Sequence, residues 1–264
     1  MKRAYFRIPV VLFWVLLLCG TSSAFDISGL QPTAPYGIFS TFSAESLPRN
    51  KIAFEAGFER SKEPDFYRFL AKGAYGISDS VEFNITVPYI LNFADSVDGM
   101  EDISIGFKHR FYDEGKYGPS LAYLINASLD NGREEFSTRG RVGIGLIVSK
   151  RVGPFKGHMN VFYERPATRK LQDELTFLGG IEFSASHSFS MLGEILARKS
   201  YFSTEYDQVE ARFGYRLKTT DSIYTTLGAG IDLKRRDPEY RILISISYTS
   251  PQEKKEIRKI FEEE

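Results

Sequence analysis

Cysteine and tryptophan are almost absent from this chain of 264 residues, which has one of each, Cys19 and Trp14. A single thiol cannot close an intramolecular disulfide, so a disulfide-stapled scaffold is excluded. An excess of one charge is also missing, because 34 Lys and Arg balance 34 Asp and Glu. A balanced chain lacks the basic surplus of nucleic-acid-binding proteins, so no nucleic-acid partner is expected. The 42% hydrophobic content in turn excludes a disordered chain.

Long hydrophobic runs are missing too, apart from one short run near the N-terminus. Three cationic residues precede an apolar stretch at 8–18, and small residues follow as far as Ala24. This order is typical of a secretory signal peptide, whereas a transmembrane helix needs about 20 apolar residues. We therefore expect 1–24 to be a signal peptide cleaved after Ala24, with an uncleaved anchor helix as the alternative. No later segment is apolar for long enough to predict a helical membrane span.

From residue 51 onward, apolar and polar residues alternate with a period of two. Ile52, Phe54 and Phe58, for example, alternate with Glu55 and Glu59. Successive side chains of a strand point to opposite faces of the sheet, so each such segment has one apolar and one polar face. About twelve segments follow this pattern. They are 51–60, 66–77, 81–90, 103–112, 120–130, 139–150, 155–165, 174–184, 189–198, 207–217, 222–234 and 240–249.

The connections between these segments alternate in length. Short ones lie at 78–80, 185–188 and 218–221, and longer polar ones lie at 91–102, 131–138, 166–173 and 199–206. Tight turns at one end and longer loops at the other are typical of an up-and-down barrel. The sequence therefore predicts an all-β fold, a closed antiparallel barrel of about twelve strands over 51–250. An even strand number would leave both chain ends on the periplasmic side.

The polar face decides between two kinds of barrel. A soluble barrel or sandwich buries its apolar face, whereas an outer-membrane barrel turns that face to lipid and lines its lumen with polar side chains. Here the polar face carries both acids and bases among many small residues, and aromatic residues lie near the strand ends, as in membrane barrels. We therefore predict a transmembrane barrel and keep the soluble fold as the alternative. The expected lumen-lining residues are Glu55, Lys72, Glu82, Lys108, Arg110, Arg141, Glu182, Glu194, Glu210, Arg212, Arg216 and Arg241.

One stretch resembles a known family. It contains a turn at Gly76-Ile77-Ser78-Asp79, a strand closing on Pro88-Tyr89, a loop over 98–102 and then Ile103-Ser104-Ile105-Gly106-Phe107-Lys108. Over about residues 35–112 the chain resembles the outer-membrane transporter-like family named for the MetA pathway of phenol degradation. The resemblance implies an outer-membrane barrel for uptake of small, often aromatic or hydrophobic compounds. It implies no particular binding residues.

Few residues suggest enzyme chemistry. The three histidines, His109, His158 and His187, share no metal-ligand spacing, and no catalytic residue, metal or cofactor is predicted. The acidic loop 95–102 could hold Ca²⁺ through its carboxylates, although a plain acidic loop is the simpler interpretation. The charged residues of the polar face could also act in catalysis, but we expect them instead to pair with one another in the lumen.

Two flanking segments complete the organisation. Residues 25–50 are rich in Pro, Ser, Thr and aromatic residues, and are expected to form either a periplasmic tail or a plug that enters the lumen. Residues 251–264 are expected to form a short charged helix.

The predicted function is passive movement of small molecules through an outer-membrane barrel. The expected partners are outer-membrane lipid, a small-molecule solute and the barrel-assembly machinery. The alternatives are a structural barrel that transports nothing and an outer-membrane enzyme that acts on lipid. In the channel interpretation, lumen width and charge would select the solute.

Overall fold

The computed structural model describes residues 29–62, 65–93, 97–168, 171–200, 208–234 and 240–251. The expected signal peptide lies outside these residues, as does all of the expected C-terminal helix except Pro251. The described part of the chain has no helix long and apolar enough to cross a membrane.

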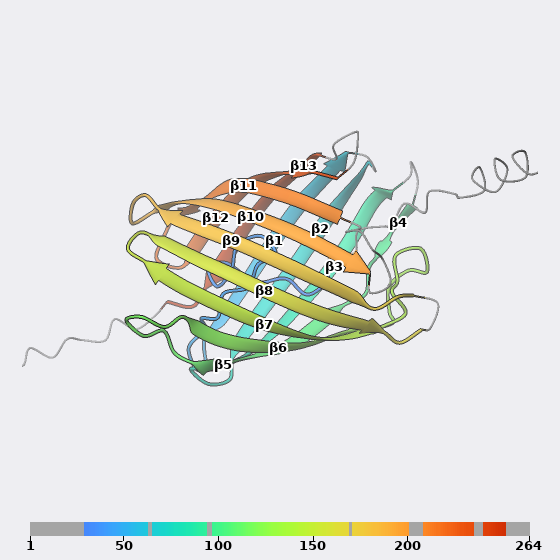
Figure 1. Cartoon of the computed structure of the whole chain (residues 1–264). Helices are drawn as coiled ribbons and strands as arrows, with labels where there is room; N and C mark the ends of the chain where they lie inside the picture. Colours follow the sequence, from blue (N-terminus) through green and yellow to red (C-terminus); the bar gives the residue numbers. More distant parts are fainter. Residues whose placement is uncertain are drawn as a thin grey trace, which may run out of the picture.

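Described residues from 52 onward form one antiparallel sheet that closes into a barrel (Figure 1). β1 pairs with β13, and β2 pairs with β3, so the ladder runs around the barrel without a free edge in its wall. All twelve predicted strands are present, with ends shifted by three residues at most, while the short β4, which pairs only with β3, was not predicted. The strands are β1 (Ile52–Lys62), β2 (Phe66–Gly76), β3 (Val81–Phe93), β4 (Val97–Met100), β5 (Ser104–Tyr112), β6 (Ser120–Ser128), β7 (Arg141–Val152), β8 (Phe155–Pro166), β9 (Glu174–Ser184), β10 (Phe189–Ser200), β11 (Gln208–Lys218), β12 (Ile223–Asp232) and β13 (Tyr240–Thr249).

The two ends of the barrel differ in their connections. One end, called the turn end below, carries the connections 77–80, 113–119, 153–154, 185–188 and 219–222. The start of β1 and the end of β13 also lie there, where the Ser250 amide donates to the Ile52 carbonyl over 2.9 Å. The opposite loop end carries most of the longer connections, including β4 and 129–140. In Figure 1 the turn end is on the left and the loop end on the right.

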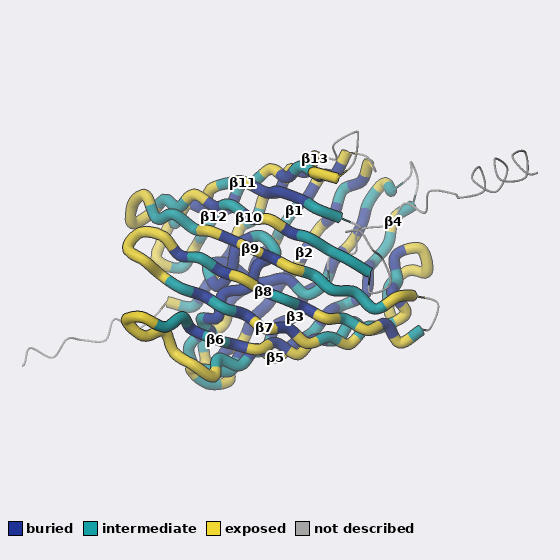
Figure 2. Tube along the Cα trace, viewed as in Figure 1, coloured by how far each residue is buried: buried dark blue, intermediate teal, exposed yellow. Residues whose placement is uncertain are grey.

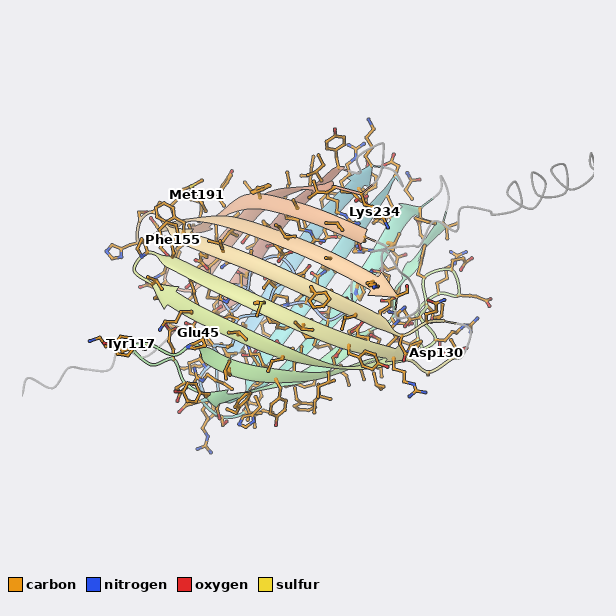
Figure 3. All side chains as sticks on the ribbon, in the orientation of Figure 1. Glu45, Tyr117, Asp130, Phe155, Met191 and Lys234 are labelled. Atoms are coloured by element: carbon orange, nitrogen blue, oxygen red, sulfur yellow. The ribbon has the colours of Figure 1, made fainter. Side chains whose placement is uncertain are left out.

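The wall is apolar outside and polar inside. Phe213, Val142 and Ile242 are 65%, 62% and 54% exposed, whereas Arg68 and Lys108 are 1% and 0% exposed. Most apolar side chains of the alternating pattern therefore point away from the barrel, as the sticks in Figure 3 show. This distribution is that of a membrane barrel, and it overturns the soluble alternative, which requires the apolar face inside.

Aromatic side chains on the outer face gather toward both ends of the strands. Tyr75, Phe111 and Tyr248 lie near the turn end, and Tyr163 and Tyr240 lie near the loop end. Amphipathic rings at these two levels suit the two polar boundaries of a bilayer.

An arginine on the outer face should destabilise the barrel strongly. Phe213 lies within β11 and is largely exposed, so Phe213→Arg places a charge in the apolar band and should lower the free energy of unfolding by about 2–4 kcal/mol. Urea unfolding in liposomes, followed by heat-modifiable gel mobility, measures this change. The control is Leu233→Arg, beyond the end of β12, which should cost less than about 1 kcal/mol. Equal costs for the two variants would contradict a lipid-facing wall.

Residues 29–50 precede β1 and run through the barrel interior (Figures 1 and 2). Most residues from 31 to 47 are buried, and Gly37 and Phe42 form an isolated bridge within the segment. We call residues 31–47 the inner segment. Gly29 and Leu30 border a cavity on the loop side, so the described chain starts in the loop half and leaves at the turn end. The start of β1 and the end of β13 share one side, as the even strand number predicts, while the two ends of the chain lie outside the described residues.

Candidate functional site in the barrel interior

Inward-facing acids and bases pair between neighbouring strands of the wall. Glu55 on β1 lies opposite Lys72 on β2 in the strand register, and Glu82 on β3 lies opposite Lys108 on β5. Their side chains form ion pairs of 2.7 and 2.9 Å. Side chains directly opposite on one face of an antiparallel pair lie close enough to interact, so the register itself creates these pairs.

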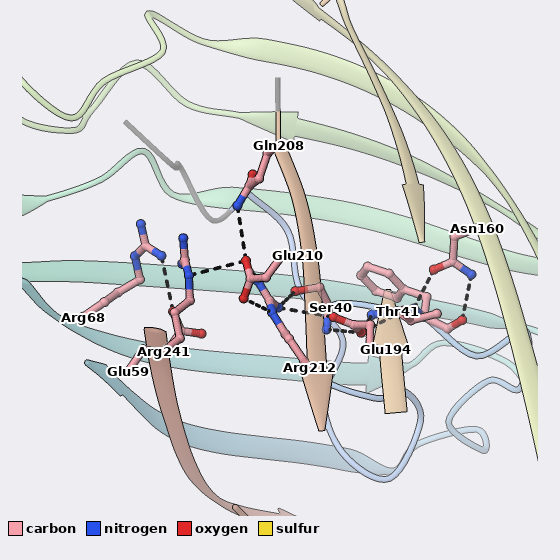
Figure 4. Close-up of polar contacts among 11 residues, drawn as sticks. Ser40, Thr41, Glu59, Arg68, Asn160, Glu194, Gln208, Glu210, Arg212 and Arg241 are labelled. Atoms are coloured by element: carbon pink, nitrogen blue, oxygen red, sulfur yellow. Dashed lines mark hydrogen bonds and ion pairs between the residues drawn. The ribbon is translucent and has the colours of Figure 1, made fainter. Parts of the chain in front are cut away.

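A larger charged network occupies the loop half of the interior (Figure 4). Arg212 on β11 contacts Glu210 at 2.7 Å and Glu194 on β10 at 3.3 Å. Glu210 also contacts Arg241 on β13 at 3.4 Å. Every charged group in this set is at least nine-tenths buried, so each charge depends on its partners to offset the loss of hydration.

A second branch of the network joins the wall to a loop. Arg68 on β2 contacts Glu59 on β1 at 3.3 Å and Glu101, beyond β4, at 2.9 Å. Both carboxylates are buried, Glu101 completely. The loop after β4 is therefore attached to the inner face of the barrel.

The predicted lumen residues occupy three kinds of position. Arg141, within reach of the loop-side cavity, contacts Glu174 at 3.0 Å, and the half-buried Glu182 lies 3.6 Å from Arg216. Arg110 lies at the turn end, where it donates to the Asp79 carbonyl and pairs with the exposed Asp113, so it braces turns. The others are buried on the inner face, namely Glu55, Lys72, Glu82, Lys108, Glu194, Glu210, Arg212, Arg216 and Arg241.

Several inward carboxylates bind backbone amides of the inner segment. Glu55 accepts from the Ala34 amide at 2.7 Å, and Glu82 accepts from the Leu47 amide at 2.7 Å. Glu194 accepts from the amides of Ser40 and Thr41 at 2.8 Å each and from the Thr41 hydroxyl at 2.7 Å. Hydrogen bonds with an ionised acceptor are about twice as strong as neutral ones, so the wall holds the segment firmly.

Inward donors bind the carbonyls of the same segment. Lys108 donates to the carbonyls of Ser43 and Glu45 at 3.0 and 2.6 Å, and Arg216 donates to the Gly37 carbonyl at 2.6 Å. Asn160 contacts Phe42 twice, accepting from its amide at 2.6 Å and donating to its carbonyl at 2.9 Å.

These partners are spread around the barrel, on β1, β3, β5, β8, β10 and β11. They mostly recognise the backbone of the segment and satisfy polar groups that would otherwise be buried without partners.

The inner segment also fills an apolar patch inside the barrel. The Phe42 ring packs edge-on against Phe162 with 5.9 Å between the ring centroids. Leu124, Leu178 and Leu196 surround this pair from neighbouring strands. Phe42 is 1% exposed, so the patch is covered where the segment crosses it.

Two cavities lie on either side of the inner segment. The loop-side cavity opens to solvent and is bordered by Ser40 of the segment and by charged and apolar groups of the wall. The turn-side cavity is bordered by Pro35 of the segment. The segment thus lies between the two spaces.

Serine and histidine meet inside the barrel, but their contacts are structural. Ser149 shares a 2.8 Å hydrogen bond with His158, and the same hydroxyl accepts from the Ala44 amide at 2.8 Å. Both side chains lie beneath the inner segment and are at most 6% exposed. His109 instead contacts the Tyr123 hydroxyl at 3.1 Å on the outer wall. Neither histidine is placed to activate a serine on an accessible surface.

The described carboxylates of the acidic loop, those of Asp98, Glu101 and Asp102, bind groups within the protein. Asp98 accepts from the Asn92 amide, and Glu101 pairs with Arg68. Asp102 accepts from the Gly132 amide at 2.9 Å and from the Thr138 amide and hydroxyl at 2.6 and 2.5 Å. Within the described residues, no three His, Cys, Asp or Glu side chains gather in a way that could hold a metal ion. Asp102 is therefore a clamp on the 129–140 loop.

Removing this clamp should loosen the loop. Asp102→Ala leaves the donors of Gly132 and Thr138 without their acceptor, so Arg133 and Arg139 should be cut by trypsin about tenfold faster. Limited proteolysis of the folded barrel gives the rate. The matched control is Asp130→Ala, which removes one exposed hydrogen bond to Ser137 and should change the rate little. A loop equally resistant in both variants would show that Asp102 does not hold it.

The alternating pattern of the sequence does not predict every polar side chain that makes important contacts inside the barrel. Glu101 lies outside the predicted strands, and Asn160 and Ser149 are uncharged, so none of the three belongs to a charge pattern. Their importance comes from the inner segment and the loops, which only the folded chain brings to them. The alternation of the polar face does mark Glu59 and Arg68.

Sequence comparison identifies no relative, since no family model and no curated protein matches this chain. The resemblance to the phenol-degradation family therefore stays a prediction.

Solved structures do match. The NanC porin has a TM-score of 0.60 at 10% identity, covering 74% of this chain and 98% of that chain. The COG4313 outer membrane channel from Pseudomonas putida F1 has a TM-score of 0.58 at 10% identity, covering 78% and 98%. The KdgM porin has a TM-score of 0.55 at 9% identity, covering 74% and 98%. At such low identity these likenesses show the fold, and the fold is that of a porin-like β-barrel.

Proposed function

We propose that this protein is a bacterial outer-membrane channel for passive diffusion of small solutes, closed in the described conformation by residues 31–47 of its own chain. The observation that carries the proposal is the inner segment, held by polar side chains around the lumen between two solvent-open cavities. A barrel of twelve strands is wider than the filled eight-stranded type and narrower than open porins, so one chain segment is enough to obstruct it.

The outer wall supports a membrane location. Its apolar residues are exposed and its aromatic residues lie near both strand ends, and the matching structures are porins and an outer-membrane channel. Export through a signal peptide cleaved after Ala24 is part of the proposal, as is insertion by the barrel-assembly machinery.

The loop-side cavity indicates the kind of solute. Leu124, Phe162 and Leu178 form an apolar wall, while Arg198 and Arg241 lie among the other lining residues. The chemistry of this lining matches a small molecule with a hydrophobic or aromatic body and a polar group. This solute class agrees with the resemblance found in the sequence.

A disulfide staple tests the closed state directly. A Cβ atom built at Gly180 on β9 would lie 3.4 Å from the Cβ atom of Thr41, close to the separation found in disulfides. The only native cysteine, Cys19, lies in the expected signal peptide, so Thr41→Cys/Gly180→Cys adds the only two thiols of the mature chain. In a planar bilayer, we expect the oxidised variant to conduct no current and reduction to restore the channel events of the native chain.

The single-cysteine variants are the controls for the disulfide experiment. Each single-cysteine variant should be insensitive to oxidation, because it has no partner thiol. Conductance through the oxidised double variant equal to that of the native channel would show that the segment does not close the pore. If neither protein conducts with or without reductant, and liposome swelling is also absent, a structural barrel is the better description.

A further inference from the structure

The turn-side cavity has a lining unlike the rest of the interior. Three cations border it, Arg151, Arg216 and Lys218, with a single carboxylate, Glu182, and one histidine, His187. Lys218 also pairs with Asp221, which lies outside the lining, at 2.8 Å. Three cations therefore face two carboxylates, whereas elsewhere inward bases and acids pair one to one, as in the pairs of Glu55 with Lys72 and Glu82 with Lys108. The cavity keeps an excess of one positive charge.

Hydroxyl groups surround the same space. The other lining residues include Ser184, Ser186, Ser188, Ser190 and Tyr224. Ser184, Ser190 and Arg216 lie opposite one another across β9, β10 and β11 in the strand register, which places them in one row. A row of hydroxyl donors beside a guanidinium is the donor set that binds oxyanions.

One buried donor in this cavity lacks a hydrogen-bond acceptor. Nη2 of Arg216 donates to the Gly37 carbonyl at 2.6 Å, and Nε lies 3.4 Å from the Thr226 hydroxyl. Among the described residues, Nη1 finds no hydrogen-bond partner, and the nearest carboxylate, Glu182, is 3.6 Å away. The Arg216 side chain is 5% exposed. A buried guanidinium nitrogen without an acceptor is costly, and an anion in the cavity would satisfy it.

From these features we propose that the turn-side cavity is a binding site for a phosphate-type oxyanion, free or carried by a small solute. Nη1 of Arg216 would donate to the anion, Arg151 and Lys218 would supply charge at its open side, and Ser190 would add a hydroxyl. Arg216 also holds Gly37, so the site adjoins the inner segment directly. This site goes beyond diffusion through the barrel and does not depend on it.

Direct binding to the full mature barrel in detergent tests the proposal. Isothermal titration with inorganic phosphate, and separately with glycerol phosphate, is compared with chloride at equal ionic strength. We expect saturable binding of at least one phosphate probe, and the pair of probes tells a free anion from one carried on a solute. Arg151→Gln/Lys218→Gln leaves Arg216 and its contact with Gly37 in place and should weaken binding about tenfold. Ser190→Ala should weaken it about twofold or more through the lost hydroxyl.

A matched control separates a site from general charge attraction. Arg165→Gln removes an exposed arginine near the loop end of β8, outside the cavity, and should leave phosphate binding unchanged. Absence of saturable phosphate binding to the native barrel would overturn the site. An equal loss in Arg165→Gln and in the double variant would also overturn it, by showing an adventitious ion held by surface charge. Neither result bears on whether the barrel conducts, because titration needs no open pore.

Discussion

Removing residues 31–47 should turn the barrel into a continuously conducting pore. The deletion joins residue 30 to residue 48 and leaves every strand from β1 to β13 intact. Strand pairing and the outer apolar face stabilise the wall independently of the segment, so the barrel should still fold. With the segment gone, the two cavities join, and we expect single-channel conductance to rise by at least about tenfold. Planar-bilayer recording of the native and deleted proteins measures the change.

The deletion needs a fold check and a comparison. Heat-modifiable mobility must show that the deleted protein is a folded barrel, since a collapsed wall would also change conductance. Adding a synthetic peptide of residues 29–50 should reduce the current, because Glu55, Glu82 and Glu194 bind the backbone of this stretch. A peptide with the same composition in scrambled order should reduce it less, since Phe42 would no longer meet Phe162. A deleted protein that folds and conducts like the native one would show that the lumen is closed by other groups.

Alternation alone was enough to predict the wall of this barrel. A strand exposes its side chains to two different environments, and the sequence records both, as at Glu55 and Lys72 on the inside and Phe213 on the outside. Because each strand repeats the pattern, errors at the ends of one strand do not change the count. The strands and the direction of their faces could therefore be predicted, whereas β4, four residues long, has too few positions to show a period.

The inner segment could not be predicted in the same way. Its contacts with the wall run mainly through its own backbone, as in the hydrogen bonds from the amides of Ala34 and Leu47, and backbone groups are the same for every sequence. The acids of the wall are related to the inner segment, because these buried carboxylates accept hydrogen bonds from its backbone amides and also pair with basic side chains. Glu194, for example, has Arg212 as its basic partner and also accepts from two backbone amides. Sequence shows that a carboxylate faces inward, but it does not show which donor will reach it.

Replacing Glu194 with alanine should release the inner segment without removing it. The carboxylate accepts from the amides of Ser40 and Thr41 and from the Thr41 hydroxyl, and it pairs with Arg212. In Glu194→Ala the amides of Ser40 and Thr41 and the Thr41 hydroxyl lose their acceptor, whereas Arg212 keeps Glu210. A hydrogen bond to a charged group contributes about 1.5–3 kcal/mol, and these three form only with the segment inside the barrel, so the open fraction should rise by roughly a hundredfold or more. The fraction of time spent conducting in a planar bilayer reports this equilibrium.

Two further variants separate the contact from the charge. Glu194→Gln keeps an oxygen that can accept from the amides but loses the ion pair with Arg212, which retains Glu210, so its open fraction should lie between those of the native chain and Glu194→Ala. Glu174→Ala removes another lumen carboxylate, one that binds Arg141 and not the inner segment, and should leave the open fraction near the native value. If Glu174→Ala opens the channel as much as Glu194→Ala, lumen charge and not the hold on residues 40–41 controls closure. If only the Glu194 variants open it, these two amides are where the wall fastens the segment that closes the lumen.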